Sequence, residues 1–256
     1  MTRANCLRRA FTLIELLIVL GVIAILLAIL LPALSAGRNA ANDLRCRAQL
    51  RTVTQAFIQF STDSSGVNRG DSEQLSDRLF RLEDFQESIY GIAEFWIGPK
   101  SSRVSFGSPL PPLVCPAASG RLEKRANTPC SSGAVGPQQN VSIGFNRRLN
   151  IGTRYIGQIP RAANVYLAEK ILQFPDVPLL FDVDGAKAVT LGVVPYYAAP
   201  AVSTSPPDIY AGGKFWFPSF RHRGAMSVGF VGGHVLSSRR PLYEPWWRWD
   251  YQPDIQ

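Results

Sequence analysis

The chain has few residues of the types that carry out chemistry in proteins. Among its 256 residues are two histidines and four cysteines: His222, His234, Cys6, Cys46, Cys115 and Cys130. No G-x-S-x-G elbow, phosphate-binding G-x-x-x-x-G-K loop or H-E-x-x-H zinc motif occurs, and no histidine lies near a plausible serine or cysteine nucleophile in the sequence. The sequence therefore predicts that the protein is not an enzyme.

The two histidines are poorly placed to share a metal ion. The segment from Ala225 to Val231 between them has the pattern of a strand. A straight strand that rises about 3.4 Å per residue would hold them roughly 20 Å apart. We therefore predict no metal site and assign both histidines to structural hydrogen bonds.

Two acidic residues, Asp182 and Asp184, alternate before Gly185 and resemble a fragment of a calcium loop. Such carboxylates supply the hard oxygen ligands that calcium takes, but the later bidentate glutamate of a complete loop is missing. The segment is thus either a weak calcium site or a plain hairpin turn. No other cofactor is predicted.

One acid, Glu15, lies inside a long apolar stretch and is the only ionisable residue between Phe11 and Leu34. As a helix these 24 residues reach roughly 36 Å, enough to cross a hydrocarbon core of about 30 Å. A carboxylate at that depth costs about 2.5–3.5 kcal/mol and needs a partner. The sequence predicts a single membrane span with one functional acid.

Charge alone does not orient this span. Basic residues flank it on both sides, with Asp43 as the one acid close behind it: Arg3, Arg8, Arg9, then Arg38, Arg45, Arg47 and Arg51. Over the whole chain the net charge is +8, and the cations are scattered among acids and proline-rich loops. This favours a solvated mixed surface, and nucleic acid is not an expected partner.

The residues from Arg8 to Leu16, RRAFTLIEL, resemble the processing site of type IV prepilins. The resemblance implies that a membrane prepilin peptidase cuts between Ala10 and Phe11 on the cytoplasmic side and methylates the new amine. It departs from the family at Ala10, where glycine is usual, which implies slower processing. It also implies that Glu15 pairs with the Phe11 amine of a neighbouring subunit, and it matches Pro32 to a proline that loosens the helix in many pilins.

Several later stretches resemble a bacterial prepilin-like family with an H-x(9)-D-G region. They are Phe220 to Val235, where Gly232 replaces the family's aspartate, Leu31 to Leu34, Cys46 with Leu50, and Val114 to Pro116. That family has no head activity to transfer. Calcium binding in the heads of major type II pseudopilins strengthens the Asp182 and Asp184 hypothesis.

Three cysteines remain once the leader carrying Cys6 is removed. Outside the cytoplasm a disulfide is permitted. Cys115 with Cys130 would close a short loop, whereas Cys46 with Cys115 would join the helix to the head. We favour the second pair because Cys46 lies on an apolar stripe, with an inert core thiol as the alternative.

Helical periodicity continues beyond the span. Five apolar residues repeat at offsets of four and three: Cys46, Leu50, Val53, Phe57 and Phe60. One helix over about 12–60 is therefore predicted, followed by a turn-rich segment and a second helix near 72–95. An Asp71–Gln74 capping box would begin the second helix, and Leu75, Leu79, Leu82, Gln86 and Ile89 would form its face.

Residues 98–140 are rich in proline and are predicted to form irregular loops with short extended pieces. Strands are predicted at 141–145, 164–169, 177–182 and 187–191, and a hairpin at 225–238. A two-residue Gly232–Gly233 turn would set Val231 opposite His234, Phe230 opposite Val235 and Val228 opposite Ser237. The fold class is α+β, a pilin-like long helix with a mainly antiparallel sheet.

The tail from Tyr243 to Tyr251 concentrates three tryptophans. These rings either cover the sheet or form a partner contact, and we favour packing.

Together these features predict a pseudopilin or minor pilin of a pilus or secretion pseudopilus. Residues 1–10 are the leader, 11–34 the membrane span, 35–60 the soluble half of the helix and 61–256 the extracytoplasmic head. The predicted location is the bacterial inner membrane, crossed once with the amino terminus cytoplasmic and the head periplasmic. The expected partners are the prepilin peptidase, other pilin or pseudopilin subunits and membrane lipid.

Three alternatives remain. A signal-anchored extracytoplasmic binding protein would not polymerise, and a DNA-binding minor pilin would bind duplex DNA with steep salt dependence. A secretory signal cleaved after Ala36 is less consistent, because the apolar run is long and contains Glu15.

Overall fold

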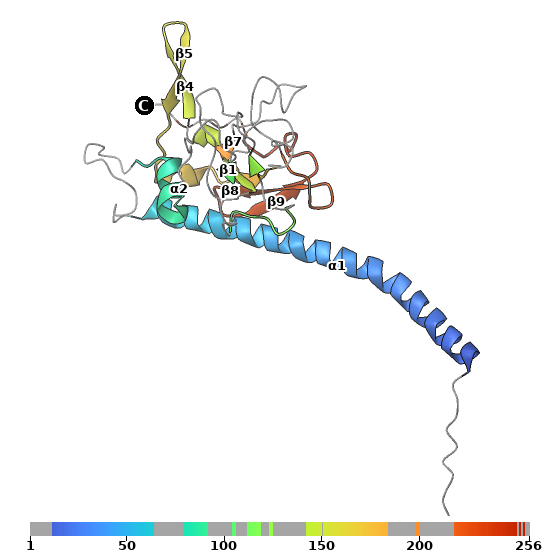
Figure 1. The fold of residues 1–256 in the computed structure, drawn as a ribbon. Coiled ribbons are helices and arrows are strands. Elements are labelled where there is room, and N and C mark those ends of the chain that lie inside the picture. Colours follow the sequence, from blue (N-terminus) through green and yellow to red (C-terminus); the bar gives the residue numbers. More distant parts are fainter. Residues whose placement is uncertain are drawn as a thin grey trace, which may run out of the picture. The chain divides into compact units, whose positions relative to one another are not determined.

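Figure 1 shows a computed structural model of the chain. The described residues are 12–63, 79–91, 104–105, 112–118, 123–124, 142–149, 151–183, 198–199, 218–249, 251 and 253. The chain divides into two compact units, Met1–Ala41 and Asn42–Gln256. The predicted end of the membrane span at residue 34 and the predicted start of the head at residue 61 differ from this division. Both boundaries stay predictions.

Helix α1 runs from Leu13 to Thr62, close to the predicted 12–60. Its buried side chains all lie in the second unit: Cys46, Leu50, Val53, Thr54, Phe57, Phe60 and Ser61. The predicted apolar stripe is therefore confirmed. The helix in this unit packs against the sheet, because the Thr54 hydroxyl donates to the Gly233 carbonyl at 3.3 Å and a Cβ on Gly229 would come within 2.8 Å of Thr54 Cγ2.

Helix α2 is shorter than predicted and covers Leu82–Tyr90. It starts with a capping box in which the Arg81 amide donates to the Asp84 carboxylate, and it ends at Gly91, whose positive φ of 62° terminates the helix. Residues 71–78, including the predicted capping box, lie outside the described residues. The predicted face is partly wrong, since Phe85 is fully buried and Ile89 is 43% exposed.

The head contains a five-stranded sheet in the order β7-β3-β6-β8-β9. Its strands are β3 (Ile143–Asn146), β6 (Pro178–Asp182), β7 (Ala198–Ala199), β8 (Met226–Phe230) and β9 (Val235–Ser238). Only the β3–β7 pairing is parallel, so the α+β class with a mainly antiparallel sheet is confirmed.

Other described segments form two smaller sheets of two strands each. β1 (Val104–Ser105) pairs with β2 (Glu123–Lys124), and β4 (Ile151–Ile156) pairs with β5 (Ile159–Asn164). The strand predicted at 164–169 is wrong. Apart from the final residue of β5 and a single bridge from Leu167 to Phe80, that segment leads into a 3₁₀ turn at Glu169–Gln173. The strand predicted at 187–191 falls outside the described residues.

The β8–β9 hairpin has a different register from the predicted one. Val228 pairs with Leu236, and Ser227 pairs with Ser237, so the predicted pairing is displaced by one residue. The Phe230 amide donates to the His234 carbonyl, which leaves a three-residue loop. A two-residue turn of the predicted type needs positive φ at two residues, and only Gly233 has it, at 84°.

Among the described residues, two buried clusters form the core of the second unit. The larger contains the stripe of α1 with Phe80 and Phe85, whose rings meet Phe57 edge to face. The smaller lies under the tail, where Trp249 packs on Phe181 at 5.4 Å between ring centroids. Trp249 thus covers the sheet as favoured, whereas Trp246 is 77% exposed.

Candidate functional site

The amino-terminal segment begins, in the described part of the chain, with a helix cap. The Glu15 carboxylate accepts hydrogen bonds from the Thr12 amide at 2.9 Å and from the Thr12 hydroxyl at 2.8 Å. The Glu15 amide in turn donates to the Thr12 hydroxyl at 3.3 Å. This is a reciprocal capping box, which satisfies amide groups that the first turn of a helix leaves unpaired. Ala10 and Phe11, the predicted processing residues, lie outside the described residues.

The apolar half of α1 has the length and composition of a membrane span. Its most apolar 18-residue window has a mean hydropathy of 3.2, and none of that window is buried by the chain itself. Pro32 lies inside the continuous helix, and its predicted loosening of the helix stays a prediction. This segment, with Glu15 near its start, is the candidate assembly surface.

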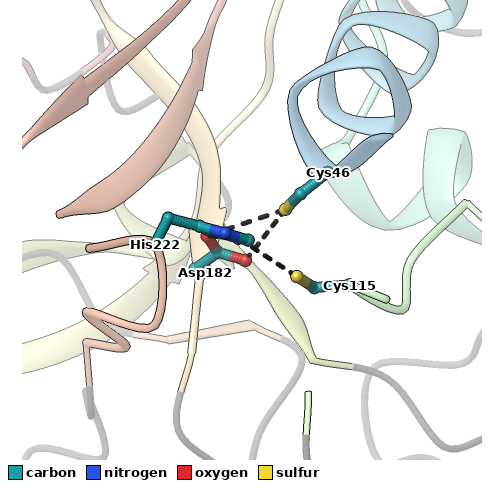
Figure 2. Close-up of side chains that lie close together, drawn as sticks. All are labelled: Cys46, Cys115, Asp182 and His222. Atoms are coloured by element: carbon teal, nitrogen blue, oxygen red, sulfur yellow. Dashed lines mark hydrogen bonds and ion pairs between the residues drawn. The ribbon is translucent and has the colours of Figure 1, made fainter. Parts of the chain in front are cut away.

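A second candidate site lies in the head, where four residues from distant parts of the sequence meet (Figure 2). They are Cys46 on α1, Cys115 on the 112–118 segment, Asp182 at the end of β6 and His222 in the turn before β8. One ligating atom from each lies within 4.8 Å of all the others. We call these four residues the buried cluster, because their exposed fractions are 0–6%.

Contacts inside the buried cluster are close. The Cys46 thiol donates to the Asp182 carboxylate, with Sγ to Oδ1 at 3.4 Å. Cys115 Sγ lies 3.2 Å from His222 Nε2, and this nitrogen lies 3.6 Å from Asp182 Oδ2. Figure 2 shows all four side chains directed toward one another.

Charged residues surround the buried cluster. Asp43 Oδ1 lies 3.9 Å from His222 Nδ1, the ring nitrogen opposite the thiol contact. Arg221 Nη1 lies 3.6 Å from Asp182 Oδ1, and the Ser227 amide donates to Asp182 Oδ2 at 3.4 Å. The arrangement therefore contains acids, a base and thiols in one place within the core.

The surroundings shift the pKa values of the two thiols in opposite directions. Hydrogen bonding with the neighbouring Cys46 side chain lowers the pKa of Cys115, and the contact with His222 adds to this effect. The same bond, together with burial, raises the pKa of Cys46. Cys115 is therefore favoured as a thiolate, the form in which cysteine binds metals.

Burial and the neighbouring charges also shift the pKa values of Asp182 and His222. Burial raises the pKa of Asp182 to about 6, against the opposing effect of Arg221. Burial disfavours the charged His222, but its contacts with Cys115 and Asp182 outweigh burial and raise its pKa. The pKa of each of these buried groups therefore depends on its neighbours in the cluster.

The structure brings together some of the predicted site residues and separates others. Cys46 and Cys115 lie in the same cluster as free thiols, so the predicted disulfide stays a prediction. Asp182 lies beside two sulfur atoms, which do not suit calcium. Asp184 lies outside the described residues, and the calcium hypothesis is not tested there.

The structure places one histidine beside a buried cysteine, a contact that the sequence did not indicate. His222 contacts Cys115, which lies 107 positions earlier in the sequence, whereas His234 stacks on Phe230 and lies 3.9 Å from Asp176. The cluster was missed because its members come from four separate elements. The resemblance at Cys46, Val114–Pro116 and Phe220–Val235 had marked three of the four segments without indicating that they meet.

Two comparisons with known proteins found matches to part of the chain. The family described as "Prokaryotic N-terminal methylation motif" matches residues 6–31. The type IV wide pilus major component PilA4 of Thermus thermophilus is 38% identical over 68 residues, which are 27% of this chain and 52% of PilA4. The matched part thus spans about half the length of this relative, and no solved structure matches the chain.

The methylation-motif match at residues 6–31 covers Glu15 and much of the apolar part of α1. Such a helix with this motif fits a protein anchored in the inner membrane. The chain therefore carries an N-terminal methylation motif and is similar over part of its length to a type IV pilin.

Proposed function

We propose that this protein is a pseudopilin or minor pilin subunit of a pilus or secretion pseudopilus. It is cleaved between Ala10 and Phe11 by a prepilin peptidase, methylated on the new Phe11 amine and assembled through α1 with like subunits. The amino terminus lies in the cytoplasm before cleavage and the head lies outside the inner membrane. The observation that carries this proposal is the methylation motif at residues 6–31 on a helix that can span a membrane.

The chemistry of Glu15 supports an assembly role. A carboxylate near the start of a lipid-embedded helix is costly, and its Thr12 bonds satisfy helix amides without supplying a positive charge. The Phe11 amine of an adjacent subunit would supply that charge. A charge-assisted hydrogen bond in a medium of low dielectric constant is stronger than one in water.

The burial of the Cys115–His222 pair is also consistent with a structural role for the protein. The Cys115–His222 pair is the one thiol–imidazole contact among the described residues, and both side chains are almost fully buried. A catalytic nucleophile must reach a substrate, so this pair lacks the access that an enzyme needs. In the function proposed here, the protein is the substrate of a processing enzyme and a building block of the filament.

Crosslinking in native membranes tests this proposal. Formaldehyde treatment of cells that express the pilus or secretion machinery is expected to give a ladder of bands at multiples of the mature mass. Cells without the prepilin peptidase serve as the control and should give only the unprocessed monomer. A lone monomer band in peptidase-containing cells would support the signal-anchored binding protein instead and contradict assembly.

A further inference from the structure

The donors in the buried cluster form a set that proteins use for zinc. Two cysteine sulfurs, one histidine nitrogen and one carboxylate oxygen are each established zinc ligands, and four ligands complete a tetrahedral structural site. Sulfur donors select against calcium and magnesium, which take oxygen. We propose that Cys46, Cys115, Asp182 and His222 bind a structural zinc ion inside the head.

The ligand atoms are close enough together to surround one ion, since one atom from each residue lies within 4.8 Å of all the others. With bonds of about 2.0–2.3 Å, neighbouring ligand atoms of such a site lie about 3.3–3.8 Å apart. Three of the distances are close to this spacing: Asp182 Oδ2 lies 3.7 Å from Cys46 Sγ and 3.6 Å from His222 Nε2, and Cys115 Sγ lies 3.2 Å from His222 Nε2. The cluster needs only small side-chain shifts to accept zinc.

The residue behind the histidine supports the same conclusion. Zinc-binding histidines usually hold their second ring nitrogen against a carboxylate, which fixes the ring and its tautomer. Here Asp43 Oδ1 lies 3.9 Å from His222 Nδ1, while Nε2 faces the cluster. Arg47 donates two hydrogen bonds to Asp43 and holds that carboxylate in place.

The charges around the ion would balance. Two thiolates and one carboxylate bring three negative charges, which zinc reduces to a single negative charge. Arg221 Nη1 lies 3.6 Å from the Asp182 carboxylate and supplies the remaining positive charge. Zinc binding releases one proton from each thiol that was protonated, so the site is filled more readily as the pH rises.

The consequence is a link between parts of the head that are far apart in sequence. Cys46 comes from α1, and its three partners come from the 112–118 segment, from β6 and from the turn before β8. Because the site is closed to solvent and offers four protein ligands, the ion would hold these elements together and leave no position for a substrate. The zinc site is independent of filament assembly.

Metal analysis of the full mature chain tests the proposal. The protein is purified in detergent under reducing conditions, supplied with zinc sulfate, dialysed and measured for zinc by atomic emission. We expect about one zinc per chain, the occupancy of a single four-ligand site. His222→Ala should lose this zinc, and His234→Ala, which changes the histidine outside the cluster, should retain it.

Cobalt replacement reports on the ligands without any mutation. Co²⁺ bound in the same site should show a sulfur-to-metal charge-transfer band in the near ultraviolet and the strong visible bands of tetrahedral cobalt. Cys46→Ser should weaken the charge-transfer band. If His222→Ala does not fold, Asp43→Asn gives a milder test, with zinc affinity expected to fall about 10–100-fold in competition with a coloured chelator.

Three results would overturn the zinc site. One is reduced wild-type protein that binds no zinc and gives no cobalt charge-transfer band. Another is equal zinc in His222→Ala and His234→Ala. The third is wild-type protein purified from its native membranes without zinc and with a Cys46–Cys115 disulfide, detected as a linked peptide pair.

Discussion

Replacing Glu15 with valine is expected to remove most of the crosslinked oligomers while leaving the monomer in the membrane. Valine inserts into lipid more favourably than glutamate by about 3 kcal/mol, so anchoring should not suffer. The lost pairing with a neighbour's Phe11 amine, at about 1.5–3 kcal/mol, weakens each contact by about 10–150-fold. The measurement is the ratio of oligomer to monomer after formaldehyde crosslinking.

Thr12→Val is the matched control for this variant. Both changes break the hydrogen bond between the Thr12 hydroxyl and Glu15, but only Glu15→Val removes the carboxylate. We therefore expect Thr12→Val to assemble nearly as well as the wild type. A full ladder with Glu15→Val, or equal loss in both variants, would assign Glu15 to helix capping alone and contradict the pairing role.

Replacing Trp249 with alanine is expected to lower the free energy of unfolding of the head by about 3–5 kcal/mol. The side chain is 2% exposed, packs on Phe181 and donates from Nε1 to the Pro241 carbonyl at 2.9 Å. Its removal leaves a cavity beneath the tail and a carbonyl without this donor. Denaturant unfolding of the mature chain in detergent, followed by circular dichroism, measures the loss.

Trp246→Ala provides the comparison within the same tail. Trp246 is 77% exposed, and a surface substitution of this kind usually changes stability by less than about 0.5 kcal/mol. Equal effects from the two variants would contradict the packing role of Trp249. A stable Trp246→Ala protein that loses crosslinks to other subunits would identify the exposed part of the tail as a partner contact.

Local pattern predicted the helical part of this fold well. Cys46, Leu50 and Phe57 repeat at helical spacing, and helical spacing alone decides which face is buried. The end of α2 was placed too late because Gly91 stops the helix through its left-handed conformation. That glycine could have been recognised as a helix terminator, since glycine at this position is common.

The strands were harder to predict because their register depends on contacts elsewhere. The β8–β9 loop holds three residues because Gly232 lies against Pro175, where a Cβ would come within 2.5 Å of the proline Cβ. A residue 57 positions earlier therefore constrains the turn. The β4–β5 hairpin was not predicted because its strands, which contain Arg154 and Arg161, show no clear alternation of apolar and polar residues. Gly157, which has a positive φ, forms the turn between them.

The two candidate sites differ in how far a sequence can reveal them. Glu15 was identified because it is a single acid in an apolar run beside a known processing pattern. The buried cluster has no such local signal, since Cys46 and His222 are 176 positions apart and come together only through tertiary packing. Spacing motifs for zinc detect ligands that are close in sequence, which these are not.

The chain isolated from its native membranes offers the most direct test of the proposed function. Intact-mass analysis, with fragmentation of the amino-terminal peptide, should find a protein that begins at Phe11 and carries one methyl group on its α-amine. An amino terminus at the intact Met1, or at Gly37 after cleavage as a secretory signal, would contradict processing and the filament role that follows from it.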